Sequence, residues 1–148
     1  MGAIASGGIL VLNDEIIRQF GITERMIRAV VAEEEHELVR RELEYRHGRD
    51  PLDISRRTVI LVDDGLATGA RMRAAARALR KKHPARIVVA VPVGAAETRG
   101  QFQIEADEVV CGKCPNDLTA IGPSYEDFTQ TTDKEVCELL AGASQVVH

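Results

Sequence analysis

The stretch TVILVDDGLATGARMRAAARAL, Thr58 to Leu79, decides the fold. It opens with the apolar and mostly β-branched run Val59 to Val62, which predicts a strand buried on both faces. Two carboxylates, Asp63 and Asp64, follow at once and lead into a short turn with two glycines. From Ala70 the apolar residues recur with the spacing of a helix that has one apolar stripe. The stretch therefore predicts a strand, a loop and a helix whose N-terminus faces the carboxyl end of the strand.

The loop has the properties of a phosphate site. Free backbone N–H groups and the positive end of the helix dipole favour an anion there. Glycines let the backbone approach a phosphate closely, and the hydroxyl of Thr68 can donate one more hydrogen bond. Ionised Asp63 and Asp64 can only accept hydrogen bonds, so they suit paired sugar hydroxyls. A phosphate in the loop and a diol on the acids together describe a ribose 5-phosphate.

Two other phosphate loops fit this stretch less well. A Walker-type loop requires G-x-x-x-x-G-K-[ST], and no Lys follows Gly69. The dinucleotide fingerprint G-x-G-x-x-G is absent as well. The remaining alternative is a structural turn that the acids merely begin.

VILVDDGLATGA resembles the phosphoribosyl pyrophosphate (PRPP) signature of the type I phosphoribosyltransferases, in which two acids and then Thr-Gly follow an apolar run. The resemblance implies that Asp63 and Asp64 are catalytic and hold the ribose 2- and 3-hydroxyls. It also implies that the loop holds the 5-phosphate, through Gly65, Leu66, Ala67, Thr68, Gly69 and Ala70. Arg71 stands where the family often has Thr or Ser, and it could either reach the phosphate or obstruct the pocket.

The resemblance covers nearly the whole chain, which we interpret as a single domain over residues 1–148. GAIASGG, RRELEYRHGR and SYEDFTQTTDKEV also look like the stand-alone phosphoribosyltransferases of bacteria. The resemblance implies transfer of phosphoribose from PRPP to an unknown acceptor base with release of pyrophosphate. It further implies Mg²⁺ bound mainly through PRPP, with no metal site made by the protein itself.

The family has a further segment before the position of Met1, which supplies a core strand and an Arg/Lys-Gly-Gly loop for pyrophosphate. No such loop occurs in these 148 residues, so the fold is expected to be incomplete at its N-terminus. An unpaired sheet edge would then favour a homo-oligomer. The alternative function is a non-catalytic module that binds PRPP or a nucleotide.

A long helix is predicted from Glu24 to about His47, beginning at Thr23. Its first half carries a stripe expected to face the core, made of Met26, Ile27, Val30 and Val31. Its second half is dense in charge, which is typical of a solvated helix with ion pairs such as Glu37–Arg41. The alternative is a basic cluster leaning over the site to hold pyrophosphate, with Arg41 as the catalytic candidate and Arg40, Arg46, Arg49 and Tyr45 around it.

The flanking segments predict an α/β fold with a mostly parallel sheet and flanking helices. A hairpin is expected around Gly7-Gly8, and buried strands are expected over residues 86–91, closed by Pro92, and 108–111. A helix is expected within residues 95–106, and a last one begins at Thr132 or Asp133. Strands that alternate with helices predict right-handed crossovers, and ligands bind beyond the carboxyl ends of such strands.

Two further features remain open in the sequence. Tyr125 and Phe128 could stack on a planar base, or could instead pin a loop to the core. Cys111 and Cys114 form a lone CxxC, which we interpret as a buried strand-end thiol and a loop thiol rather than a zinc or redox site.

Composition narrows the class of protein. A net charge of −4 gives no footprint for nucleic acid or for an anionic membrane surface. No apolar run approaches the length of a membrane span, and no signal peptide is evident. The odd number of cysteines, three, does not suggest a disulfide framework, so a cytoplasmic location is expected.

Overall fold

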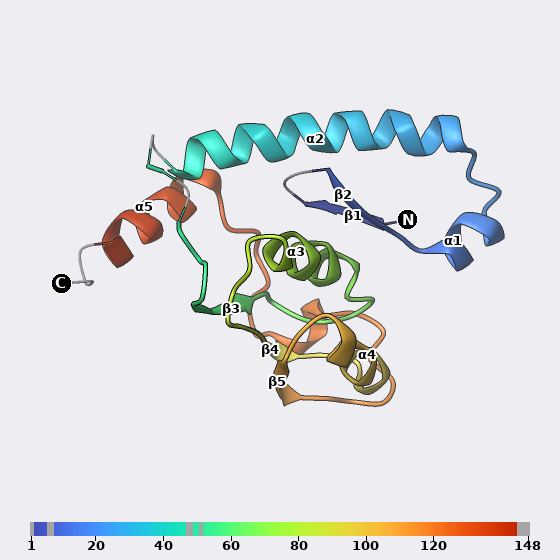
Figure 1. Cartoon of the computed structure of the whole chain (residues 1–148). Coiled ribbons are helices and arrows are strands. Elements are labelled where there is room, and N and C mark those ends of the chain that lie inside the picture. Colours follow the sequence, from blue (N-terminus) through green and yellow to red (C-terminus); the bar gives the residue numbers. More distant parts are fainter. Residues whose placement is uncertain (1, 6–7, 47–48, 51, 145–148) are drawn as a thin grey trace.

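A parallel three-stranded sheet forms the centre of the fold (Figure 1). The computed structural model describes residues 2–5, 8–46, 49–50 and 52–144. The strands lie in the order β3-β4-β5, with β3 at Thr58–Val62, β4 at Arg86–Val93 and β5 at Glu108–Lys113. Helix α3 (Ala70–Arg80) connects the first pair, and α4 (Ala96–Gln101) with the 3₁₀ turn η1 (Phe102–Ile104) connects the second. The predicted α/β fold with parallel strands and flanking helices is confirmed.

The core lies between the sheet and its two crossover connections. Strands that follow one another in the same direction, joined by right-handed crossovers, place both connections on one face of the sheet. The side chains of β4 that face them, Ile87, Val89 and Val91, are buried. Met72 of α3 and Phe102 of η1 close the cluster from the helical side. This packing fixes the start of α3 relative to the strand ends.

Strand β3 differs from the expectation of burial on both faces. Its exposure alternates along the strand, and the side chains of Ile60 and Val62 are 62% and 74% exposed. The reason is its place at the edge of the sheet, where α3 covers only the face that bears Val59 and Leu61. Strand β4 also continues past Pro92, where the sequence predicted its end. Pro92 is tolerated in the strand because the pairing of β4 with β3 has already ended at Ala90.

An N-terminal hairpin lies against α3 on the side away from the sheet (Figure 1). Its strands β1 (Gly2–Ala5) and β2 (Ile9–Leu12) pair antiparallel, which confirms the predicted hairpin, and Gly2 lies opposite Leu12. Of the expected turn, Gly8 adopts a positive φ of 70°, while Gly7 lies outside the described residues. Helix α1 (Asp14–Gln19) follows and is capped by the side chain of Asn13, which accepts a hydrogen bond from the N–H of Ile16.

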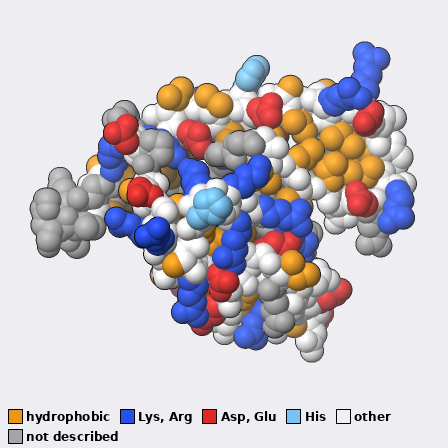
Figure 2. Space-filling model, viewed as in Figure 1, with side chains coloured by type: hydrophobic (Ala, Val, Ile, Leu, Met, Phe, Trp, Pro, Cys, Tyr) orange, Lys and Arg blue, Asp and Glu red, His pale blue; other side chains and the backbone are white. Residues whose placement is uncertain are grey.

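The long helix α2 (Glu24–Arg46) crosses above the hairpin (Figure 1). The stripe expected to face the core is not buried, since α2 has no buried residue among those described and Met26 and Val30 are exposed. The physical reason is that α2 meets the small hairpin rather than the sheet, and a two-stranded ribbon covers little of a helix. Hydrophobic side chains consequently gather on the surface near the start of α2 (Figure 2).

The last helix, α5 (Asp133–Ser144), packs against the carboxyl end of α2. The short turn η2 (Gly122–Ser124) precedes it. Thr132 and Glu135 form a reciprocal capping box, in which each side chain accepts a hydrogen bond from the backbone N–H of the other. This confirms the predicted start of the helix. None of the described helices is long and apolar enough to cross a membrane.

Candidate functional site

A cavity of about 140 Å³ opens where β3 ends and α3 begins. It is lined by the continuous segment from Asp63 to Met72 and by Ile121 from the segment after β5. The predicted ribose phosphate residues all lie in this lining, namely Asp63, Asp64, Gly65, Leu66, Ala67, Thr68, Gly69, Ala70 and Arg71. The structure therefore brings the predicted binding segment together around one hollow.

The loop presents a row of unused backbone donors. Among the residues that the structure describes, none accepts a hydrogen bond from the N–H groups of residues 67–71. The first turn of α3 has no preceding helical carbonyls to accept these bonds, and no side chain caps it at Gly69. Unpaired N–H groups at a helix N-terminus attract an anion, and they add to the positive end of the helix dipole.

Leu66 fastens this loop to the sheet. Its N–H donates to the carbonyl of Val93, and its own carbonyl accepts from Ala95, each at 2.9 Å. Its side chain is 1% exposed and belongs to the core cluster. Because both backbone groups of Leu66 are already paired, its part in the predicted binding segment is to hold the loop in place.

Two glycines of the loop are closely packed, and one of them also has a positive φ. Gly69 has a φ of 70°, and a Cβ there would lie 2.5 Å from the ring of Phe102. A Cβ on Gly65 would meet the side chain of Ile121 at 2.4 Å. The hydroxyl of Thr98 donates to the carbonyl of Ala67 and steadies the middle of the loop. Sequence reasoning missed Ile121 and Thr98, because both come from segments without a motif.

The two acids at the cavity have different environments. The side chain of Asp63 is 20% exposed, whereas Asp64 is exposed to solvent. Burial raises the pKa of Asp63, while two contacts oppose this: the N–H of Asp64, which donates to Oδ1 of Asp63 at 3.0 Å, and the Arg71 guanidinium. The guanidinium of Arg71 lies 3.5 Å from Asp63 and is otherwise exposed. Arg71 therefore stands beside the acids, at the rim of the cavity.

Tyr125 and Phe128 form a ring pair, and Tyr125 also contacts the backbone of Asp64. The hydroxyl of Tyr125 donates to the backbone carbonyl of Asp64 at 2.6 Å. The two rings contact one another at a tilted angle with their centroids 5.2 Å apart, and the ring of Phe128 also packs on Gly122. Tyr125 thus ties its segment to the loop of the acids, while the ring of Phe128 remains half exposed.

Residues 3–127 match the phosphoribosyl transferase domain. The chain belongs to this family. It is 40% identical over 139 residues to the Mycobacterium tuberculosis H37Rv protein named "Putative phosphoribosyl transferase Rv0571c" and to its counterpart in strain CDC 1551. That alignment covers 94% of this chain but only 31% of the mycobacterial protein. The crystal structure of TT1426 from Thermus thermophilus shares 37% identity and superposes with a TM-score of 0.73, over 95% of this chain and 66% of that one.

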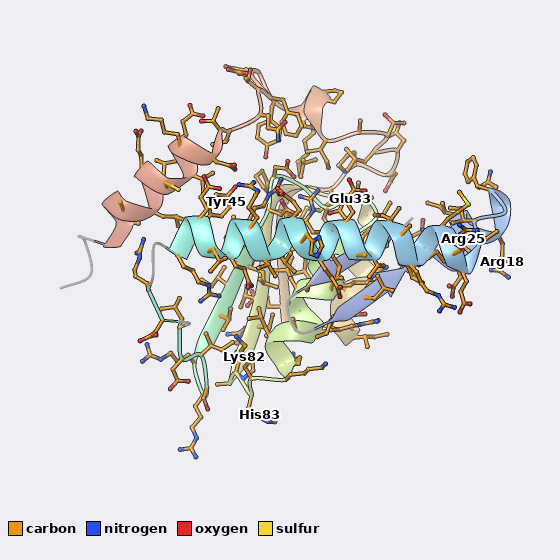
Figure 3. The ribbon with its side chains drawn as sticks, turned by 90° about the horizontal axis from the view of Figure 1, so that it is seen from above. Arg18, Arg25, Glu33, Tyr45, Lys82 and His83 are labelled. Carbon is orange, nitrogen blue, oxygen red and sulfur yellow. A yellow bond between two sulfur atoms is a disulfide. The ribbon has the colours of Figure 1, made fainter. Side chains whose placement is uncertain are left out.

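Two members of the predicted basic cluster of this phosphoribosyl transferase domain, Arg40 and Arg41, are engaged in ion pairs. Arg40 pairs with Glu37 at 2.7 Å, with Glu44, and with Asp133 of α5 at 3.1 Å. Tyr45 donates its hydroxyl to the same Asp133. Seen from above, Tyr45 and α5 lie on one side of α2 and Lys82 and His83 on the other (Figure 3). Arg40 and Tyr45 therefore join α2 to α5 through Asp133.

Arg41 lies at a second cavity, which adjoins the loop of residues 63–71 through Arg71. Its guanidinium is 2.7 Å from Glu37, whose pKa is lowered to about 2 chiefly by the hydrogen bond from Arg40. This cavity of about 430 Å³ lies between the hairpin and α2, and Arg71 lines both cavities. The predicted catalytic Arg41 thus lines a cavity that it shares with Arg71 of the loop.

The CxxC motif differs from the expectation of two separate thiols. The structure pairs Cys111 at the end of β5 with Cys114 in the following loop as a disulfide, and Cys137 is free. The short loop between them folds back far enough for the two sulfur atoms to meet, which spacing alone does not reveal. No cluster of three or more metal-ligating side chains occurs in the described part of the chain.

Proposed function

We propose that this phosphoribosyl transferase domain binds the ribose 5-phosphate part of PRPP at the loop of residues 63–71. The observation that carries the proposal is the row of unpaired N–H groups over residues 67–71, which shares one cavity with the carboxylates of Asp63 and Asp64. A phosphate is the anion that such donors fit, and a vicinal diol supplies the two donors that a pair of carboxylates accepts.

The reaction supported by this arrangement is transfer of phosphoribose from PRPP to an acceptor base. The bond from C1 to pyrophosphate breaks, the base forms the new bond at C1, and the ribose ring gains positive charge between the two events. With their oxygens on the ribose hydroxyls, Asp63 and Asp64 place negative charge next to that ring. Fixed charge of this kind stabilises the charge that develops in the transition state.

The residues present also fit a magnesium ion that is held mainly by the substrate. Mg²⁺ commonly binds through one or two carboxylates together with substrate phosphates and water. Asp63 and Asp64 supply two carboxylates at the cavity, which suits that shared mode. Once bound, the ion would offset the negative charge of the departing pyrophosphate.

A second function, a module that binds PRPP or a nucleotide without turning it over, is favoured by one observation. Two cations of the adjoining cavity form ion pairs, since Arg41 pairs with Glu37 and Arg71 with Asp63. Fewer free cations then remain to steady a leaving pyrophosphate. In this alternative the domain binds ribose phosphate but does not catalyse the transfer.

Calorimetric titration of the chain with ribose 5-phosphate, and with PRPP plus Mg²⁺, tests both functions. The double variant Asp63→Asn with Asp64→Asn should weaken both ligands by about a hundredfold, because two charge-assisted contacts are lost. Asp50→Asn with Asp53→Asn is the matched control, since it removes the same charge from the loop that leads into the opposite end of β3. Equal affinity of the wild type and the site variant would overturn the binding site. Tight PRPP binding without release of pyrophosphate, across a panel of purine and pyrimidine bases, would select the binding module.

A further inference from the structure

The segment Cys111 to Cys114 (CGKC) contacts the residues that hold Leu66 of the phosphate loop in place. Gly94 and Leu66 form an isolated parallel bridge, which extends the sheet beyond the end of β3. The carbonyl of Lys113, which lies between the two cysteines, accepts a 3.0 Å hydrogen bond from the N–H of Gly94. The carbonyl of Pro115, just after Cys114, accepts from the N–H of Ala96 at 3.3 Å. The residues on either side of Cys114 are therefore hydrogen-bonded to the segment that holds Leu66.

Side-chain packing follows the same path as these hydrogen bonds. A Cβ placed on Gly94 would lie 3.0 Å from the Cβ of Leu66 and 3.4 Å from the sulfur of Cys111. Only the backbone of Gly94 thus lies between the sulfur of Cys111 and the side chain of Leu66. Cys111 also packs against the core cluster that contains Leu66. A displacement of Cys111 is consequently felt at Leu66.

The Cys111–Cys114 bond adds little to the global stability of the fold, so its effect is expected to be local. A disulfide stabilises mainly by closing a long loop in the unfolded chain, and here the two cysteines are only three positions apart. Both cysteines are only half-buried, so small thiol reagents can reach them. A short, accessible disulfide beside a binding loop suits reversible chemistry better than permanent cross-linking.

We propose that Cys111 and Cys114 form a redox modification site whose dithiol and disulfide states set the affinity of the phosphate loop. The coupling to affinity rests on the ribose phosphate site proposed above, whereas the modification itself does not. The disulfide holds the carbonyls of Lys113 and Pro115 in place for Gly94 and Ala96. Opening it releases that segment and loosens the support of Leu66.

The reactant is a low-molecular-weight disulfide. One cysteine thiolate attacks a sulfur of this reagent, forms a mixed disulfide and expels one small thiol. The second cysteine thiolate then attacks the mixed disulfide at the protein sulfur, closes the internal bond and expels the second small thiol. Two electrons pass from the cysteine pair to the reagent, and the two cysteine protons balance the two thiols released. A small dithiol reverses the exchange.

The first test measures the two states of the full chain directly. After treatment with oxidised glutathione, alkylation in denaturant should label only Cys137, whereas the chain reduced with dithiothreitol should label all three cysteines. The amides of Leu66, Gly94 and Ala96 should exchange with deuterium roughly fivefold faster in the reduced chain, while amides inside α2 stay unchanged. Three labelled cysteines after oxidation, or equal exchange in both states, would overturn the proposal.

The second test measures affinity for ribose 5-phosphate in both states. The oxidised chain should bind roughly fivefold more tightly, and Cys114→Ser should bind like the reduced chain under either treatment. Cys137→Ser is the matched control and should keep the full redox response. A response that persists in Cys114→Ser would contradict the assignment. If neither state binds the sugar phosphate, the proposed function fails, and the exchange rates alone decide whether the redox site is coupled to the loop.

Discussion

The hydroxyl of Tyr125 donates a 2.6 Å hydrogen bond to the backbone carbonyl of Asp64, across 61 residues of sequence. Tyr125 comes directly after the turn η2, and Ile121 just before that turn lines the cavity at residues 63–72. One segment after β5 therefore lines the cavity and also holds the backbone of Asp64, an acid proposed to bind the ribose. We therefore expect order in this segment and order in the acids to be coupled.

Replacement of Tyr125 by Phe should remove this coupling and leave the ring contact with Phe128 in place. We expect the free energy of unfolding to fall by about 1 kcal/mol, the usual net value of one hydrogen bond. We also expect ribose 5-phosphate to bind about threefold more weakly, because the loop of Asp64 loses part of its preorganisation. Chemical denaturation and calorimetry measure the two effects. In the control Phe128→Leu, the free energy of unfolding should fall while the affinity for ribose 5-phosphate stays within error. An unchanged affinity in Tyr125→Phe would mean that Tyr125 only packs.

The raised pKa of Asp63 predicts a conflict between stability and binding. Burial is the main cause, so the fold prefers the protonated form of this carboxyl group. A raised pKa in the folded state means that its contribution to stability is fully present below the unfolded-state value and is lost as the pH rises through the folded-state value. At neutral pH, ionised Asp63 therefore destabilises the fold, and the same charge is what a ribose hydroxyl requires.

Asp63→Asn should accordingly be more stable than the wild type at pH 7 while it loses the sugar phosphate. The difference in melting temperature between the two should vanish at low pH, below the ordinary Asp value of 3.8, and grow as the pH rises. Asn retains an oxygen that can accept the hydrogen bond from the N–H of Asp64. Thermal unfolding across a pH series checks this, with the exposed Asp53→Asn as control. A variant less stable than the wild type at pH 7 would show that the contact with Arg71 outweighs burial.

The central segment of the fold could be predicted because its local signals agree. The apolar run before Asp63, the glycines after it and the apolar stripe from Met72 onward each specify one element, and the strand–loop–helix exists as predicted. Alternating strands and helices then determine a parallel sheet through the handedness of the crossovers. The candidate site follows from the same segment, because its lining is almost continuous in sequence.

The errors arise where long-range packing decides. A β-branched strand such as β3 has the same composition at an edge as in the middle of a sheet, so the exposure of Ile60 and Val62 could not be anticipated. The stripe of α2 has the right spacing but meets only the hairpin. Ile121 reaches the cavity, and Cys111 meets Cys114, through loop conformations that carry no periodic signal.

Gly69 should be far less tolerant of a side chain than Gly100, although each lies in or beside a helix of this fold. At Gly69 a Cβ would require a residue with a φ of 70° and would lie 2.5 Å from the ring of Phe102, which cannot yield because it is fully buried. At Gly100 nothing lies within 4 Å of such a Cβ. We expect Gly69→Ala to lower the free energy of unfolding by about 1–3 kcal/mol, through the strained backbone and the crowded core. Gly100→Ala in α4 should be neutral or stabilising by up to about 1 kcal/mol. Denaturant unfolding of both variants checks this, and ribose 5-phosphate should lose affinity only for Gly69→Ala, whose loop must move away from Phe102. Equal stability of the two variants would mean that the loop can shift without cost. The N–H groups of residues 67–71 would then not be held in fixed positions, which contradicts the proposed site.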